Sequence, residues 1–192
     1  MSKGKYLISI LRSKKTVFSL KDIALLWHET SSSATRVRLN YYVNKGELYR
    51  IRKGFYAKDK NYNRLEFATR IMTPAYVSFE TVLVMEGMIF QFYEPIFVAS
   101  YTTRKIMADQ QNYYFRKIKN EVLFNGLGLN HENEISIATR ERAFLDILYL
   151  NTDYYFDNLD SLNWDFIFNI LPIYENKQLV KKVLSLHKQM TE

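Results

Sequence analysis

Residues 42–56 read YVNKGELYRIRKGFY, the pattern of a helix end followed by a basic hairpin. Gly46 is a natural helix stop, because glycine readily adopts the left-handed backbone found just beyond many helices. The β-branched and aromatic residues that follow predict one strand at 48–51 and another at 55–57. Between them, residues 52–54 predict a tight turn. This stretch therefore predicts a helix that runs directly into a β-hairpin.

Three helices are expected before this hairpin. Residues 5–11 can form a short amphipathic helix, and Ser19 with Asp22 resembles a capping box that begins a second helix. Residues 31–33, all serine, offer an N-cap for a third helix at 34–45. Three helices and then a hairpin is the order of a winged helix-turn-helix, whose last two helices are joined by a short turn. The alternative is a helical bundle with an incidental hairpin. The order of the elements, and the basic charge described next, favour the winged helix.

The charge of the chain is divided unequally. Residues 1–64 hold 15 Lys or Arg against 4 Asp or Glu, a net charge of +11 in a chain whose total is +7. Residues 65–192 hold 12 against 16, a net charge of −4. Such an asymmetry indicates that the N-terminal part binds a polyanion. We therefore predict an α+β protein with an N-terminal winged helix-turn-helix DNA-binding domain at 1–64 and a mixed α/β domain at 65–192.

The second part is predicted to mix helices and strands. Ser78 can cap a helix that ends at Gly87, and Thr139 can cap a helix that runs to Leu150. Residues 113–124 alternate in part and predict strands. The remaining expected elements are strands at 95–101 and 135–137, and helices at 164–171 and 176–189.

Several classes of function lack their usual sequence signals. The chain has no cysteine, which excludes disulfides, thiolate nucleophiles and zinc–cysteine sites. Its three histidines are far apart, and the acids between 153 and 165 fit an ordinary loop. No apolar run reaches 18 residues, and the basic start lacks a secretory apolar core. We therefore expect a cytoplasmic protein that is not an enzyme, with no catalytic residue, metal, cofactor or membrane contact.

The third helix carries the candidate DNA-reading side chains. Three- and four-residue spacing assigns one face to the core: Thr35, Leu39 and Tyr42. The other side is expected to face DNA: Ser33, Arg36, Asn40 and Tyr41. Arg38 lies on a flank, from which it can reach a phosphate. Arg pairs well with guanine and Asn with adenine in the major groove. The register remains open by one position, because Val37 and Tyr41 could compete for the core face.

The hairpin carries three further basic residues. Arg50 and Arg52 are two apart, so on a regular strand they share a face, and Lys53 lies at the tip before Gly54. A basic wing of this kind is expected to contact the phosphate backbone or the minor groove. The alternative is a solvated edge whose charges only prevent aggregation.

Three stretches resemble one family. Residues 42–56, 73–83 (TPAYVSFETVL) and 137–150 (IATRERAFLDILYL) are similar, in this order, to segments of the AbiEi antitoxins. These proteins are the antitoxins of type IV toxin–antitoxin systems, which act in abortive infection. The resemblance covers roughly residues 15–150. The paired-acid signature of a nucleotidyltransferase toxin is absent from the sequence, so the chain does not resemble the toxin.

The resemblance implies a transcriptional repressor that binds inverted repeats in its own promoter. It also implies that the second domain neutralises a nucleotidyltransferase toxin without forming a stable complex with it. Two other classes stay open. One is a nuclease, or another DNA-processing enzyme, that a winged helix targets to DNA. The other is a protein-interaction module, whose binding would lack the steep salt dependence of phosphate contacts.

Overall fold

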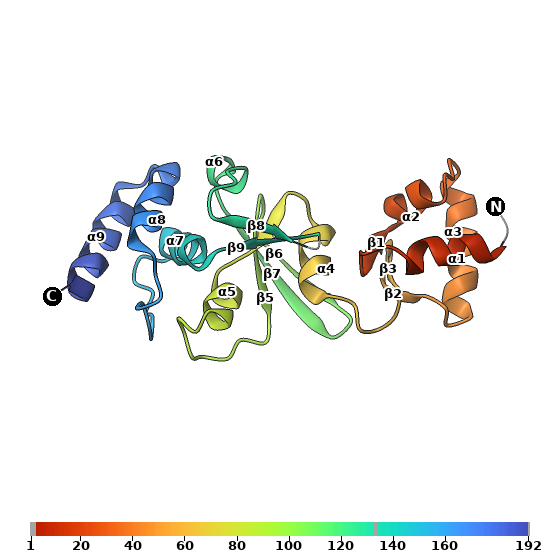
Figure 1. The fold of residues 1–192 in the computed structure, drawn as a ribbon, viewed down its shortest axis with the longest axis horizontal. Coiled ribbons are helices and arrows are strands. Elements are labelled where there is room, and N and C mark those ends of the chain that lie inside the picture. The colour runs from red at the N-terminus through yellow and green to blue at the C-terminus, as the bar shows by residue number, and fades with distance from the viewer. Residues whose placement is uncertain (1–2, 133, 192) are drawn as a thin grey trace.

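The computed structural model describes residues 3–132 and 134–191 and shows an elongated α+β molecule (Figure 1). Three N-terminal helices occupy one end, a six-stranded mixed sheet lies in the middle, and the C-terminal helices occupy the other end. The predicted α+β class is confirmed at this level. Among the helices of these two described stretches, none has both the length and the apolar composition of a membrane-spanning segment.

The N-terminal unit, from α1 to β3, combines three helices with a three-stranded antiparallel sheet of order β1–β3–β2. Its elements are α1 (Lys3–Leu11), β1 (Val17–Ser19), α2 (Leu20–Leu26), α3 (Ser32–Asn44), β2 (Tyr49–Arg52) and β3 (Phe55–Ala57). Val17 pairs with Ala57 and Ser19 with Phe55. Strand β1, which precedes α2, is therefore paired with the hairpin that follows α3.

Both expected helix caps of this unit are present. The Ser19 hydroxyl accepts a hydrogen bond from the Asp22 backbone N–H at 3.1 Å, and the Asp22 carboxylate accepts one from the Ser19 N–H at 2.7 Å. Together they form the capping box that begins α2. The Ser31 hydroxyl accepts from the Ala34 N–H and begins α3. These short polar residues therefore fix where two of the helices start.

The core of the unit confirms the predicted register of α3. Thr35 and Leu39 are fully buried and Tyr42 is 4% exposed, whereas Val37 is 71% exposed. A small apolar cluster joins α3 to the other elements: Ile10, Phe18, Ile23, Trp27, Leu39, Tyr42, Leu48 and Tyr56. The side of α3 opposite this cluster is thus free to meet a partner.

The rest of the chain is built on a mixed sheet of order β6–β7–β5–β4–β9–β8. The pairs β4–β9 and β5–β7 are parallel and the others antiparallel. The strands are β4 (Ala75–Val77), β5 (Ile96–Ser100), β6 (Arg104–Ala108), β7 (Gln111–Lys117), β8 (Leu129–Glu132) and β9 (Ile135–Ala138). The helices are α4 (Arg64–Ile71), α5 (Glu80–Met85), α6 (Asn120–Leu123), α7 (Arg140–Leu150), α8 (Trp164–Ile170) and α9 (Lys177–Thr191), with a 3₁₀ turn η1 (Leu171–Tyr174).

Helices cover both faces of this sheet. Helix α4 packs on β4, β9 and β5 and also contacts β1, so it lies between the sheet and the N-terminal unit (Figure 1). Helices α5 and α7 pack together on the opposite face, and α8 and α9 pack outside α7 (Figure 1).

Two expectations for this part need correction. Ser78 does not cap α5, because its hydroxyl instead donates to the Asp146 carboxylate at 2.7 Å in the core. Residues 113–124 are a strand only as far as Lys117, after which α6 begins at Asn120. In contrast, Thr139 does cap α7, and its hydroxyl accepts from the Arg142 N–H.

Arg142 and Asp146, on successive turns of α7, form a buried ion pair in the core. Both side chains have 0% exposure, and Arg142 Nε lies 3.3 Å from Asp146 Oδ1. The carboxylate also accepts from the hydroxyls of Tyr174 at 2.6 Å and Tyr76 at 3.2 Å. The guanidinium donates to the backbone carbonyls of Val122 and Leu127, each at 2.6 Å.

Burial raises the pKa of Asp146 above its ordinary value, and Arg142 with the hydroxyl donors opposes that rise. The network joins α7, β4, η1 and the segment around α6.

Candidate nucleic-acid interface

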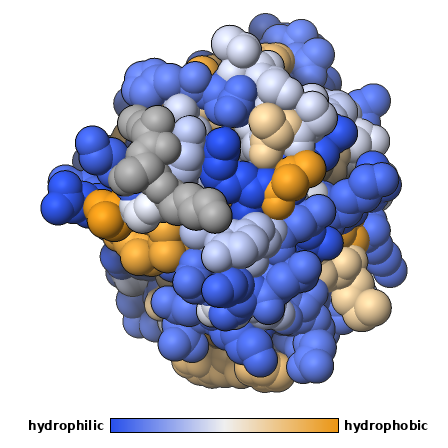
Figure 2. Space-filling model, turned by 90° about the vertical axis from the view of Figure 1, so that its right-hand side faces the viewer, coloured by the Kyte–Doolittle hydropathy of each residue, from blue (hydrophilic) through white to orange (hydrophobic). Residues whose placement is uncertain are grey.

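Four of the predicted site residues line one hollow between α3 and the hairpin. Arg36 and Asn40 come from the exposed side of α3, Arg50 from β2 and Lys53 from the hairpin tip. The hollow has a volume of about 630 Å³. It opens in the most basic segment of the chain, whose net charge is +11 over residues 1–64. The end of the molecule that carries this unit is largely hydrophilic, with isolated apolar spots (Figure 2).

A side-chain contact connects the helix and the hairpin at this hollow. Arg50 Nη2 donates a hydrogen bond to the amide oxygen of Asn40. The Arg50 guanidinium also lies 5.7 Å from the ring centre of Tyr56, within the range of a cation–π contact. Helix α3 and the hairpin therefore present their polar groups as one surface.

The hairpin separates Arg50 from Arg52, contrary to our expectation that they share a face. A β-bulge shifts the register between them, so that Arg50 pairs with Tyr56 and Arg52 with Phe55. Phe55 and Tyr56 are successive residues of a strand, so their side chains point to opposite faces of the sheet. Paired residues on neighbouring strands share a face, so Arg50 and Arg52 also lie on opposite faces. Arg52 is accordingly half-buried and does not line the hollow.

Arg38 also lies away from this hollow. Its guanidinium carbon is 3.9 Å from the ring centre of Tyr6 on α1, and its Nη1 is 3.5 Å from a carboxylate oxygen of Glu29. The side chain thus braces α1 and the turn before α3. Arg38 lies one helical turn from both Thr35 and Tyr42 of the buried face, which is the sequence signal that could have placed it there.

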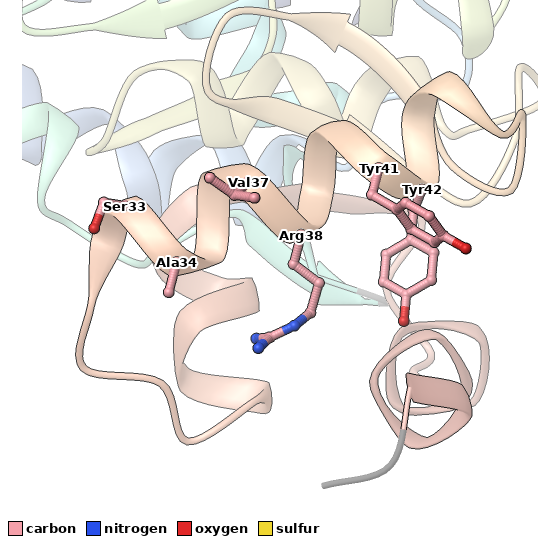
Figure 3. Close-up of a pocket in the computed structure, with 6 residues that line it drawn as sticks. All are labelled: Ser33, Ala34, Val37, Arg38, Tyr41 and Tyr42. Atoms are coloured by element: carbon pink, nitrogen blue, oxygen red, sulfur yellow. The ribbon is translucent and has the colours of Figure 1, made fainter.

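Ser33 and Tyr41 line a second hollow, on the far side of α3 from the hairpin. Its volume is about 520 Å³, and Figure 3 shows its lining side chains: Ser33, Ala34, Val37, Arg38, Tyr41 and Tyr42. The rings of Tyr41 and Tyr42 meet edge to face at 5.5 Å, and the Lys45 ammonium lies 5.3 Å from the Tyr41 ring centre. The exposed surface of α3 thus has a polar side toward the hairpin and a more apolar side away from it.

The described stretches, 3–132 and 134–191, contain no group of three or more His, Cys, Asp or Glu placed to hold a metal ion.

No family model and no curated protein matches the chain. The geometry of α3 and the hairpin therefore carries the functional conclusion.

Proposed function

We propose that residues 1–64 form a winged helix-turn-helix and that the protein is a DNA-binding transcriptional repressor. The observation that carries this proposal is the convergence of Arg36, Asn40, Arg50 and Lys53, from a helix and a hairpin, on one hollow of a strongly basic unit. Helix α3 would be the recognition helix and the β2–β3 hairpin the wing.

The chemistry of these side chains suits duplex DNA. The major groove admits an α-helix and displays guanine acceptors that a guanidinium can bind and adenine edges that an amide can bind. Arg36 and Asn40 lie one turn apart on the exposed side of α3, where such contacts are made. Lys53 at the exposed hairpin tip suits a phosphate, which fixes position without reading sequence.

The antitoxin role is a further part of the proposal and depends on the resemblance to the AbiEi antitoxins. In that role the protein represses its own operon through inverted repeats and its second part neutralises a nucleotidyltransferase toxin. Two of the similar stretches lie together in this chain. The stretch 73–83 supplies Tyr76 and Ser78, and the stretch 137–150 supplies Arg142 and Asp146, to the same buried network. Two of the three similar stretches thus meet in the core.

Binding of the intact protein to its own upstream promoter DNA tests the repressor. Affinity is expected to fall by about 10³-fold or more between 50 and 200 mM salt if six or more phosphates are contacted. A scrambled duplex of the same length is the control for specificity. Salt-insensitive binding, or no binding to upstream DNA, would refute the proposal, and Mg²⁺-dependent cleavage of the duplex would favour a nuclease.

If a nucleotidyltransferase is encoded next to this gene, rescue of cells that express it tests the antitoxin role separately. Expression of the intact protein is expected to restore growth. DNA binding without rescue would refute the antitoxin role and leave the repressor proposal standing. Purification of the two proteins together should give no stable complex.

A further inference from the structure

The exposed surface of α3 is divided into two parallel rows of side chains. One row, toward the hairpin, includes Arg36 and Asn40, which line the polar hollow. The other row is Ser33, Val37, Tyr41 and Lys45, spaced four residues apart. Residues at this spacing lie above one another on a helix and form a continuous ridge. The middle of the second ridge is apolar.

The two apolar members of this ridge have no role in the core. Val37 is 71% exposed and Tyr41 is 45% exposed, whereas the buried face is occupied by Thr35, Leu39 and Tyr42. Val37 also lines the second hollow, beside Ala34 (Figure 3). Because Val37 buries little of its surface in the folded chain, its apolar side chain is available for contact with a partner.

Charge indicates which partner covers the ridge. Lys45 lies 5.3 Å from the Tyr41 ring centre, and the neighbouring row carries Arg36. An apolar strip bordered by cations on a unit of net charge +11 fits a polyanion with apolar groups on its surface. Duplex DNA meets both conditions, because the C5 methyl group of thymine projects into the major groove.

We propose that Val37, next to the Tyr41 ring, contacts the C5 methyl group of a thymine in the operator. This inference rests on the proposed DNA-binding function and deepens it, since it names a base and the side chain that reads it. Arg36 and Asn40 read hydrogen-bonding edges of the same groove, and Val37 reads a methyl group beside them. The operator therefore contains a thymine whose methyl group contributes to affinity.

The test starts with duplexes that the intact protein selects from a random pool. Each thymine of the selected site is then replaced by deoxyuridine, which removes only the C5 methyl group. At one or more positions this replacement is expected to lower the affinity of the unaltered protein by about fourfold, the loss expected for one buried methyl-sized group. This first measurement needs no protein variant, so it does not depend on any variant folding.

The variant Val37→Ala then tests whether Val37 is the side chain that contacts the thymine methyl group. The variant is expected to bind the thymine site about fourfold more weakly and to bind the thymine and deoxyuridine sites equally. Val180→Ala, the same change at an exposed valine of α9, is the control and should keep the full sensitivity. Insensitivity of the unaltered protein to every replacement, or retained sensitivity in Val37→Ala, would overturn the inference. Failure to select any duplex would instead refute DNA binding itself.

Discussion

The Glu66 carboxylate on α4 accepts a hydrogen bond of 2.6 Å from the hydroxyl of Thr16, which lies immediately before β1. It also accepts from the backbone N–H groups of Thr16 at 2.9 Å and Val17 at 3.2 Å. Glu66 is 1% exposed, so one buried carboxylate holds the N-terminal unit against α4. The Tyr49 hydroxyl, which donates to Asp109 at 2.6 Å, forms a second link between β2 and the β6–β7 turn. The candidate DNA-binding surface is therefore positioned by the rest of the chain.

Glu66→Gln is expected to lower the free energy of unfolding by about 1–3 kcal/mol. The glutamine removes the charge that strengthens the three hydrogen bonds, and its amide nitrogen is a donor where the site supplies only donors. Urea unfolding of the intact chain measures the effect. Glu121→Gln, at an exposed position of α6, is the matched control and should change little. Equal stability of the two variants would contradict the role given to Glu66.

Asp146→Asn is expected to cost more, about 3–5 kcal/mol, because it leaves the Arg142 guanidinium buried without its counter-charge. The change keeps the size of the side chain, so the loss reports charge rather than packing. Asp153→Asn, in the exposed loop after α7, is the control. A loss of less than 1 kcal/mol by urea unfolding would show that the network tolerates an uncompensated cation.

Local patterns predicted the part of the fold that depends on neighbours in sequence. Spacing alone identified the buried face of α3, and the Ser19–Asp22 and Thr139 caps identified two helix starts. These features depend on residues at most four apart, and such contacts form within a single helix. Gly46, at a φ of 70°, ends α3 as its conformational freedom suggests.

The features that sequence reasoning missed depend on distant partners. Spacing did not reveal that the Tyr6 ring, on another helix, packs against the Arg38 guanidinium. The bulge that turns Arg52 away from Arg50 leaves no mark in the pattern of alternation. Spacing also did not reveal that apolar residues of the N-terminal part belong to the core cluster of the six-stranded sheet: Val17, Ile51, Ala57 and Tyr62.

Stability is expected to depend on the ionisation of Asp22. Burial works to raise the pKa of Asp22, but hydrogen bonds from Ser19 and Arg70 outweigh it and hold the pKa below its ordinary value of 3.8. The ionised form is thus favoured by folding, so its contribution is complete above that value and is lost as the pH falls through the lower, folded pKa. Asp22→Asn should cost about 1 kcal/mol at pH 7, the size of a hydrogen-bond contribution, and progressively less below pH 3.8. Unfolding measured across this range checks it, and a pH-independent difference would contradict it.

The final prediction separates base contacts from phosphate contacts. Arg36→Ala should weaken operator binding by roughly 1–3 kcal/mol and barely change binding to a scrambled duplex, because base contacts carry discrimination. Lys53→Ala should weaken binding to both duplexes, because a phosphate contact does not discriminate between sequences. It should also reduce the slope of affinity against salt by about one unit, because one phosphate contact is lost. Arg38→Ala is the matched control: it removes the same charge from α3, but from a side chain already held on Tyr6, so the salt slope should not change. Affinities at two salt concentrations measure all three. An equal loss on both duplexes for Arg36→Ala would make Arg36 a phosphate contact, and a reduced slope for Arg38→Ala would show that DNA draws Arg38 away from Tyr6.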